Sequence, residues 1–339
     1  MNTLLSQSYR TRPSFFPKPF QTTLPPLYHT PRILHLPLQT PPCFLLQSTK
    51  TQHTNPYTDQ NQPPLDEEEE DDDDGIASED VKILAKFKSR YNYIRVLEVS
   101  RRADHALAGS RLLLLDSPGN IHSISFLFKS LTSTYFDVFA TFPPILPPGP
   151  VAILGFGAGS AARLILHLYP DAEIHGWELD PSVISVAREY FGLSKLEKQN
   201  PDKLLIHIGD ALQAESRDGF SGILVDLFAK GSVIPELQEK TTWEELKRRL
   251  RKGGRIMVNC GGSCVEAEDP RRDGDLVMEE TVKAMREVFA DQVFVLNLGQ
   301  RKEDSCVALT GPLPDLDAWK QSLPSALRCY VDKWKRYSL

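Results

Sequence analysis

Short apolar segments alternate with amphipathic segments along the second half of the chain, from residue 151 onward. The apolar segments have the length of strands and lie at 151–154, 173–179, 203–208, 222–226 and 255–259. Segments with helical spacing lie at 160–169, 181–191, 242–251 and 275–289. Strands and helices that alternate in this way predict a parallel sheet covered by helices on both faces.

The end of the chain breaks this alternation. Two further apolar segments, 292–298 and 305–310, are joined only by a short polar stretch. A connection that short cannot carry a parallel crossover, so these two strands are expected to pair antiparallel. A mostly parallel, seven-stranded sheet that ends in an antiparallel hairpin is the class I methyltransferase fold, a Rossmann-like α/β fold. A nicotinamide-binding Rossmann domain usually continues with helices instead.

A small β-rich appendage is predicted before this domain. Strand-like segments lie at 91–99, 110–116 and 121–128, with the turn Ser117-Pro-Gly-Asn120 between the last two. A short helix at 137–142 is followed by a cluster of prolines. We therefore assign residues 76–148 to the appendage and residues 149–339 to the methyltransferase-like α/β domain.

The first 75 residues differ from the rest in composition. Residues 1–58 contain five basic residues and no acidic ones, and they are rich in Ser, Thr and Pro. This composition is typical of an organellar transit peptide, and the low Arg content favours the chloroplast over the mitochondrion. An ordinary disordered leader is the alternative. Residues 66–74 are all acidic, so we interpret residues 59–75 as a solvated acidic linker.

Charge and cysteine spacing narrow the classes of partner. The formal net charge of −6 comes largely from the acidic run, so the folded part has no basic surface that would indicate nucleic acid. No apolar run approaches the roughly 18 to 20 residues of a membrane-spanning helix. Cys260 and Cys264 lack the second ligand pair that a zinc site needs, so no metal is expected.

A glycine-rich turn joins the first strand and helix of the alternating region. Gly155, Gly157 and Gly159 allow a tight turn and a close approach of backbone to ligand. Dehydrogenases share such a turn, so the glycines alone do not identify the ligand. Their G-x-G-x-G spacing differs from the dinucleotide fingerprint, which would place the third glycine at Ser160.

Acidic residues end the next three strands, where open α/β sheets bind ligands. Glu178 is placed to accept both ribose hydroxyls of a nucleoside. Asp210 is placed to accept the adenine amino group, while the N–H of Ala211 donates to the ring. Asp226 follows the fourth strand. If the nucleoside is of the S-adenosylmethionine type, Asp226 is expected near its reactive sulfonium. Capping acids at strand-to-helix junctions are the alternative interpretation of each residue taken singly.

Over residues 90–310 the chain resembles the spermidine/spermine synthase family, which joins a methyltransferase fold to an N-terminal β appendage. The resemblance rests on Gly155, Gly157 and Gly159 for the glycine loop and on Glu178 and Asp210 for the ribose and adenine acids. It also rests on Asp226 for the catalytic aspartate, on the strand at 110–116, and on Tyr135 and Asp137 for substrate residues. The resemblance implies S-adenosylmethionine or its decarboxylated form as the donor.

Three departures separate the chain from that family. Ala158 stands where the family has an aspartate that holds the donor amine, and Ala229 stands where it has a second, polyamine-binding aspartate. Residues 291–311 contain no tyrosine, whereas the family has one there for its substrate. A diamine needs carboxylates at both ends, because an unpaired buried ammonium is costly.

Three functions are compatible with this pattern. The first is an S-adenosylmethionine-dependent methyltransferase-like enzyme, because Ala158 leaves room for the carboxylate of the intact donor. The second is a polyamine aminopropyltransferase with an altered acceptor site. The third is a non-catalytic binding or assembly protein that keeps the fold. The acceptor, a small molecule or a protein, is not identified by the sequence, and a homodimer stays open.

Overall fold

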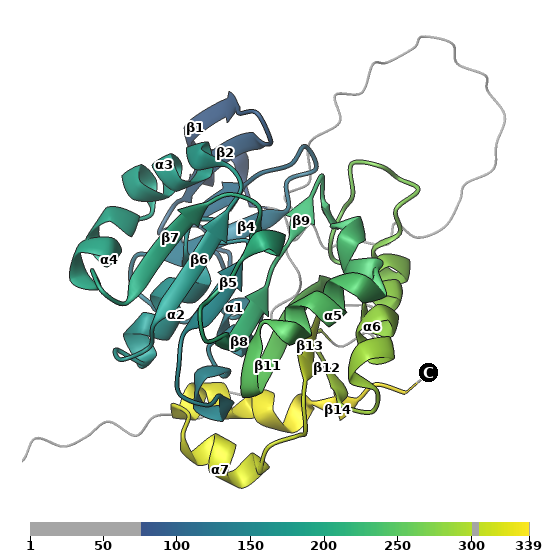
Figure 1. Cartoon of the computed structure of the whole chain (residues 1–339). Helices are drawn as coiled ribbons and strands as arrows, with labels where there is room; N and C mark the ends of the chain where they lie inside the picture. The colour runs from purple at the N-terminus through teal and green to yellow at the C-terminus, as the bar shows by residue number, and fades with distance from the viewer. Residues whose placement is uncertain (1–75, 300–304, 339) are drawn as a thin grey trace, which may run out of the picture. The chain divides into compact units, whose positions relative to one another are not determined.

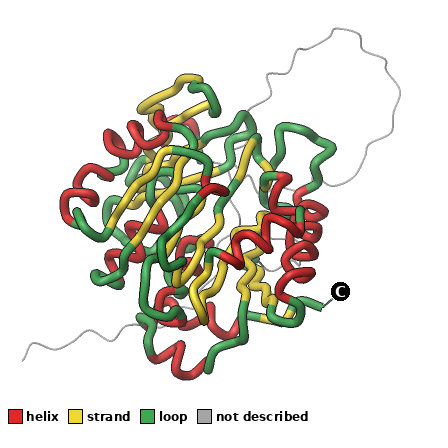
Figure 2. Tube along the Cα trace, viewed as in Figure 1, coloured by secondary structure: helices red, strands yellow, loops and turns green. Residues whose placement is uncertain are grey.

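The computed structural model describes residues 76–299 and 305–338. The predicted transit peptide and acidic linker lie outside the described residues. Figure 1 shows a small sheet from the first part of the described chain beside a larger sheet and its helices. Figure 2 shows the strands of both sheets in yellow, with helices in red around the larger one. None of the described helices is both long enough and apolar enough to span a bilayer.

The small sheet is an antiparallel meander of four strands in chain order. Its strands are β1 (Val81–Lys88), β2 (Tyr93–Val99), β3 (Ser110–Leu114) and β4 (Ile121–Phe126). The sequence pattern predicted the last three. It missed β1, an edge strand in which lysines interrupt the apolar positions and no side chain is fully buried, so its pattern lacks a buried face.

The large sheet has eight strands in the order β14-β12-β13-β11-β8-β5-β6-β7. Five adjacent strands, from β11 to the edge strand β7, run parallel to one another. They are β5 (Val151–Leu154), β6 (Ile174–Glu178), β7 (Leu204–Ile208), β8 (Phe220–Val225) and β11 (Leu250–Gly261). The predicted mostly parallel α/β sheet is therefore confirmed.

The antiparallel end of the sheet is also as predicted. β12 (Val293–Asn297) pairs antiparallel with β13 (Cys306–Thr310), which in turn lies antiparallel to β11. The expectation of seven strands is short by one, because β14 (Lys335–Arg336) adds a two-residue edge. A strand of two charged residues shows no alternation of apolar and polar positions, so the sequence pattern could not predict it. A separate two-stranded ladder joins β9 (Phe228–Ala229) to β10 (Ser232–Val233).

Alternate residues of β5 and β8 enter two different hydrophobic clusters. Ile153 and Leu224 belong to the cluster that includes the small sheet, whereas Leu154 and Val225 belong to the other. The first cluster includes buried residues of α1 (Tyr135–Phe139), α2 (Ser160–Leu168), α3 (Pro181–Tyr190) and α4 (Leu193–Gln199). The second includes α5 (Lys240–Arg248) and α6 (Gly274–Phe289). The two clusters thus cover opposite faces of the large sheet, because successive side chains of a strand point to opposite faces.

The sequence pattern missed two short helices. α4 and α7 (Leu316–Gln321) are seven and six residues long, too short to show two helical turns of periodic burial. α3, by contrast, has a strong start signal in the sequence, because Asp180 caps it through Ser182 N–H and Pro181 occupies its first turn. Length was not the only factor, because α1 has only five residues and still overlaps the short helix predicted at 137–142.

Candidate functional site

The glycine loop connects β5 to α2 and needs its glycines for conformation and contact. Gly155, Gly157 and Gly159 have φ values of 87°, 55° and 80°, in the left-handed region that favours glycine. A Cβ on Gly155 would lie 2.0 Å from the carbonyl oxygen of Asp226, and one on Gly157 would lie 2.6 Å from Ser123 Oγ. The loop therefore lies directly against the backbone of Asp226 and against β4.

Strand β4 fixes the start of the loop and of α2. The backbone N–H of Ala158 donates to Ser123 Oγ at 2.9 Å. Ser160 Oγ donates to the Ile124 carbonyl at 2.9 Å and accepts from the Ile124 N–H at 3.0 Å. Ala158 itself is fully buried in the hydrophobic cluster. The small sheet is thus part of the wall that holds the glycine loop.

Glu178 ends β6 beside that loop, with only 8% of its surface exposed. Its Oε2 accepts the Gly157 N–H at 2.9 Å and its Oε1 accepts the Asp180 N–H at 3.0 Å. Burial raises the pKa of this carboxyl, although the two backbone donors oppose that rise. Each oxygen keeps a further lone pair, so the carboxylate can also accept two ribose hydroxyls.

Asp210 and Ala211 follow β7, at the same carboxyl end of the parallel strands where Glu178 lies. Asp210 is exposed and caps a short 3-10 turn through the Leu212 N–H at 2.9 Å, while Ala211 is buried. Asp210 also lines a hollow of about 270 Å³ between this turn and α5. The large apolar side chains of Leu179 and Ile208 are 46% and 52% exposed beside Glu178 and Asp210. Exposed apolar side chains next to two acids suit a flat nucleoside base.

Asp226 follows β8 and has a hydrogen-bond donor on each carboxylate oxygen. Tyr135 Oη donates to Oδ2 at 2.8 Å, and Asn259 Nδ2 donates to Oδ1 at 3.0 Å. Desolvation raises the pKa of Asp226 to about 6, although both hydrogen bonds act to lower it. Burial and the neighbouring carboxylate raise the pKa of Tyr135 well above its ordinary value. A carboxylate with this pKa is suited to general base catalysis near neutral pH.

Of the two residues suggested as substrate contacts, only Tyr135 reaches Asp226. The Asp137 side chain is buried, and it accepts hydrogen bonds from Thr132 N–H, Thr132 Oγ1 and Ser133 N–H, each at 2.8 Å. These bonds fix the chain that leads into α1. The structure therefore gives the Asp137 carboxylate a structural role at the start of this helix.

The sequence interpretation did not single out Asn259. The register places Val258 beside Val225 on neighbouring parallel strands, so Asn259 lies level with Asp226 at the same edge. A polar residue at the end of the next strand was the available signal. Ser123, the partner of the loop, had no such signal, because its role depends on how the two sheets meet.

Among the described residues, the site includes no cluster of metal-ligating side chains. Within residues 76–299 and 305–338, no three His, Cys, Asp or Glu side chains are grouped so that they could hold a metal ion. Glu178 and Asp210 follow neighbouring parallel strands, with the exposed side chains of Leu179 and Ile208 beside them. Asp226, Tyr135 and Asn259 lie at the end of that site where Gly155 meets Asp226.

Part of the chain matches a known protein family. Residues 139–295 match the model of the spermine/spermidine synthase domain. A "probable polyamine aminopropyl transferase" of Bifidobacterium longum is 26% identical over 186 residues, which cover 55% of this chain and 39% of the relative. The spermidine synthase of Coffea arabica is 25% identical over 217 residues, which cover 62% of each protein. The chain thus spans less than two thirds of the length of either relative.

A solved structure supports the fold. The crystal structure of a "probable spermidine synthase" from Corynebacterium glutamicum superposes with a TM-score of 0.51 at 17% identity, covering 76% of this chain and 98% of that one. A likeness at this identity concerns the fold alone. The described chain therefore has an α/β methyltransferase-like fold, and residues 139–295 within it match a spermine/spermidine synthase domain.

Proposed function

We propose that this protein is a spermidine synthase-like transferase that passes the aminopropyl group of decarboxylated S-adenosylmethionine to an amine. The observation that carries the proposal is the group of Tyr135, Asp226 and Asn259 at the end of the nucleoside site. The similarity to enzymes named as aminopropyltransferases supports the same choice.

Asp226 is the residue that would accept a proton from the attacking amine. With a pKa of about 6 it is ionised at neutral pH, yet it is basic enough to take up a proton as the new bond forms. Tyr135 and Asn259 hold its two oxygens, and each oxygen keeps a lone pair for the incoming amine. Tyr135 stays protonated because its own pKa is raised.

Glu178 and Asp210 would hold the nucleoside end of the donor, and the loop that carries Gly155, Gly157 and Gly159 would lie against it. When bound, the donor supplies an electrophilic carbon next to a sulfonium, and the residues of this chain align it with the amine. The nitrogen forms a bond to that carbon as the carbon–sulfur bond breaks. The proton leaves the nitrogen for Asp226.

Methyl transfer from intact S-adenosylmethionine is the second candidate function. One specific observation favours it, namely that Ala158 offers no acid to hold a donor amine. Donor amino and carboxylate groups would then meet the loop and the first turn of α2, whose amides favour a negative group. The acceptor in either reaction is a small molecule or a protein.

The by-product of the donor distinguishes these reactions without knowledge of the acceptor. Purified full-length protein should be incubated with each donor and a panel of mono-, di- and polyamines, and the nucleosides then separated by mass spectrometry. We expect methylthioadenosine from the decarboxylated donor, and its loss in Asp226→Asn. S-adenosylhomocysteine from the intact donor would support methyl transfer instead. Donor binding without either by-product would support a non-catalytic protein.

A further inference from the structure

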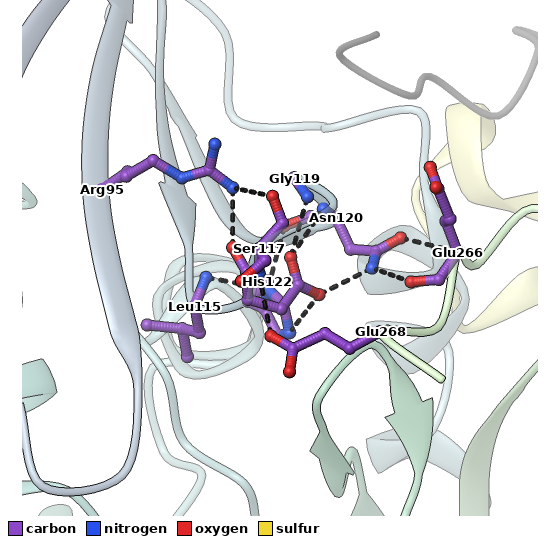
Figure 3. Close-up of polar contacts among 9 residues, drawn as sticks. Arg95, Leu115, Ser117, Gly119, Asn120, His122, Glu266 and Glu268 are labelled. Atoms are coloured by element: carbon purple, nitrogen blue, oxygen red, sulfur yellow. Dashed lines mark hydrogen bonds and ion pairs between the residues drawn. The ribbon is translucent and has the colours of Figure 1, made fainter. Parts of the chain in front are cut away.

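One side chain of the small sheet pairs with the backbone of a distant segment. Asn120, in the turn between β3 and β4, accepts the Glu266 N–H through Oδ1 at 3.0 Å. Its Nδ2 donates to the Glu266 carbonyl at 2.7 Å, as Figure 3 shows. The carboxamide therefore pairs with Glu266 in both directions, much as a neighbouring strand would.

The turn itself fixes the orientation of this carboxamide. Asp116 is 2% exposed, and its Oδ1 accepts the N–H groups of Gly119 and Asn120 at 2.9 and 3.1 Å. Its Oδ2 accepts Asn120 Nδ2 at 2.6 Å. Because the Asp116 carboxylate accepts only, the amide nitrogen of Asn120 must face it, and the oxygen is left for Glu266.

A third segment closes the junction from the turn between β9 and β10. Gly231 has a φ of 70°, and a Cβ there would lie 2.1 Å from the Glu266 carbonyl oxygen and 2.9 Å from Asn120 Nδ2. The Glu268 N–H donates to the Lys230 carbonyl at 2.9 Å. The segment 262–268 is thus held between two turns, and Gly231 leaves the room for that contact.

The same segment begins at the acceptor end of the site. It follows Asn259 on β11, whose Oδ1 accepts the Gly261 N–H at 3.1 Å while its Nδ2 holds Asp226. The charge of Cys264 within the segment adds to the raised pKa of the Tyr135 hydroxyl, after burial and the Asp226 carboxylate. The turn that holds Gly231 belongs to the β9–β10 ladder, which starts two residues after Asp226. Both segments that flank Asp226 and Asn259 therefore meet at Asn120.

We propose that Asn120 is a positioning residue for the acceptor: it holds residues 262–268 in place beside Tyr135 and Asp226, so that acceptor affinity depends on the small sheet. The acceptor part rests on the proposed function. The ordering of the segment does not, because it follows from the contacts of Asn120 alone.

The test is Asn120→Asp in the full-length protein, with hydrogen exchange and steady-state kinetics as readouts. The substitution keeps the shape of the side chain but replaces its NH2 donor with an oxygen. That oxygen faces the Asp116 carboxylate and the Glu266 carbonyl, which can only accept hydrogen bonds. Exchange of the amides of residues 262–268 should become faster by about tenfold or more, the scale of one net hydrogen bond. KM for the amine should rise about tenfold while kcat changes less than about threefold. The Kd of the donor should stay the same.

Asn200→Asp is the matched control. Asn200 is also half-buried and donates Nδ2 to a carbonyl, that of Leu196 at 2.9 Å, but it lies at the end of α4. This control should change neither the exchange of residues 262–268 nor KM. If Asn120→Asp does not fold, Gly231→Ala disrupts the same junction and should give the same pattern.

Two results would overturn the proposal. Unchanged exchange in residues 262–268 would show that Asn120 does not hold the segment, and faster exchange with an unchanged KM would show that the segment does not position the acceptor. A wild type that forms no product with any amine would count against the proposed function, and exchange would still decide whether Asn120 orders the segment.

Discussion

Replacing Asp226 with asparagine should make the protein more stable at alkaline pH while removing its activity. Desolvation raises the pKa of this carboxyl from 3.8 to about 6 in the folded state. A carboxyl whose folded pKa is raised favours folding while it is protonated, and that contribution is lost as the pH rises through the folded pKa. Ionised Asp226 is therefore a cost to stability that the proposed function requires.

The size of this cost follows from the pKa difference. The rise from 3.8 to about 6 corresponds to ~3 kcal/mol of destabilisation once the carboxyl is ionised. Asparagine avoids the charge but turns an NH2 toward a donor, Tyr135 or Asn259, so it forfeits roughly 1 to 1.5 kcal/mol of hydrogen bonding. A net gain of about 1 to 2 kcal/mol is expected near pH 8, and it should disappear toward pH 4.

Urea unfolding of wild type and Asp226→Asn between about pH 4 and pH 8 measures this directly. Asp269→Asn is a control of opposite sign, because the hydrogen bond from Arg271 lowers the pKa of Asp269 to about 2. That variant should lose stability at neutral pH. The reasoning is refuted if Asp226→Asn is less stable than wild type near pH 8, or if the difference between them does not change with pH.

Three other predictions concern the donor and the leader. Glu178→Ala should weaken donor binding by about 1.5 to 3 kcal/mol, the scale of hydrogen bonds to a charged group; equal affinities by calorimetric titration would remove Glu178 from the site. Ala158→Asp should lower Tm because the position is fully buried, and the decarboxylated donor should restore Tm more than the intact donor, since its ammonium can pair with the new carboxylate. Equal thermal shifts with both donors would contradict this. Residues 1–65 fused to a fluorescent reporter should direct it to the chloroplast, and a purely cytosolic signal would rule that out.

Most of the larger sheet was predictable because strands such as β5 and β8 are buried on both faces. Segments such as 151–154 and 222–226 are continuous apolar runs between glycines, prolines and charged residues, and they became β5 and β8. The antiparallel hairpin was predictable from the length of one connection. The edge strands β1 and β14 were not, because β1 has no fully buried side chain and β14 consists of two exposed charged residues. The edge strands β4 and β7 retained enough apolar residues to be predicted.

Individual site residues were easier to predict than their partners. Tyr135 and Asp226 were each singled out, but they are 91 residues apart in the sequence. No local pattern could therefore predict the hydrogen bond between them. The hydrogen bonds of Asp137 depend on the turn at Thr132, which the sequence pattern did not predict. Asn259 would have been found by aligning the ends of neighbouring strands, because parallel register brings those ends to one edge.

Gly155 explains why the donor and acceptor ends of the site cannot vary independently. Its missing side chain lets the loop approach the carbonyl of Asp226, where a Cβ would lie 2.0 Å from that oxygen. A Cβ there would have to displace either the loop or Asp226. Displacing the loop would disturb Glu178 through the Gly157 N–H, and displacing Asp226 would disturb Tyr135 and Asn259. One backbone contact thus couples the positions of Glu178 and Asp226, and in the proposed reaction their separation sets the alignment of donor and acceptor.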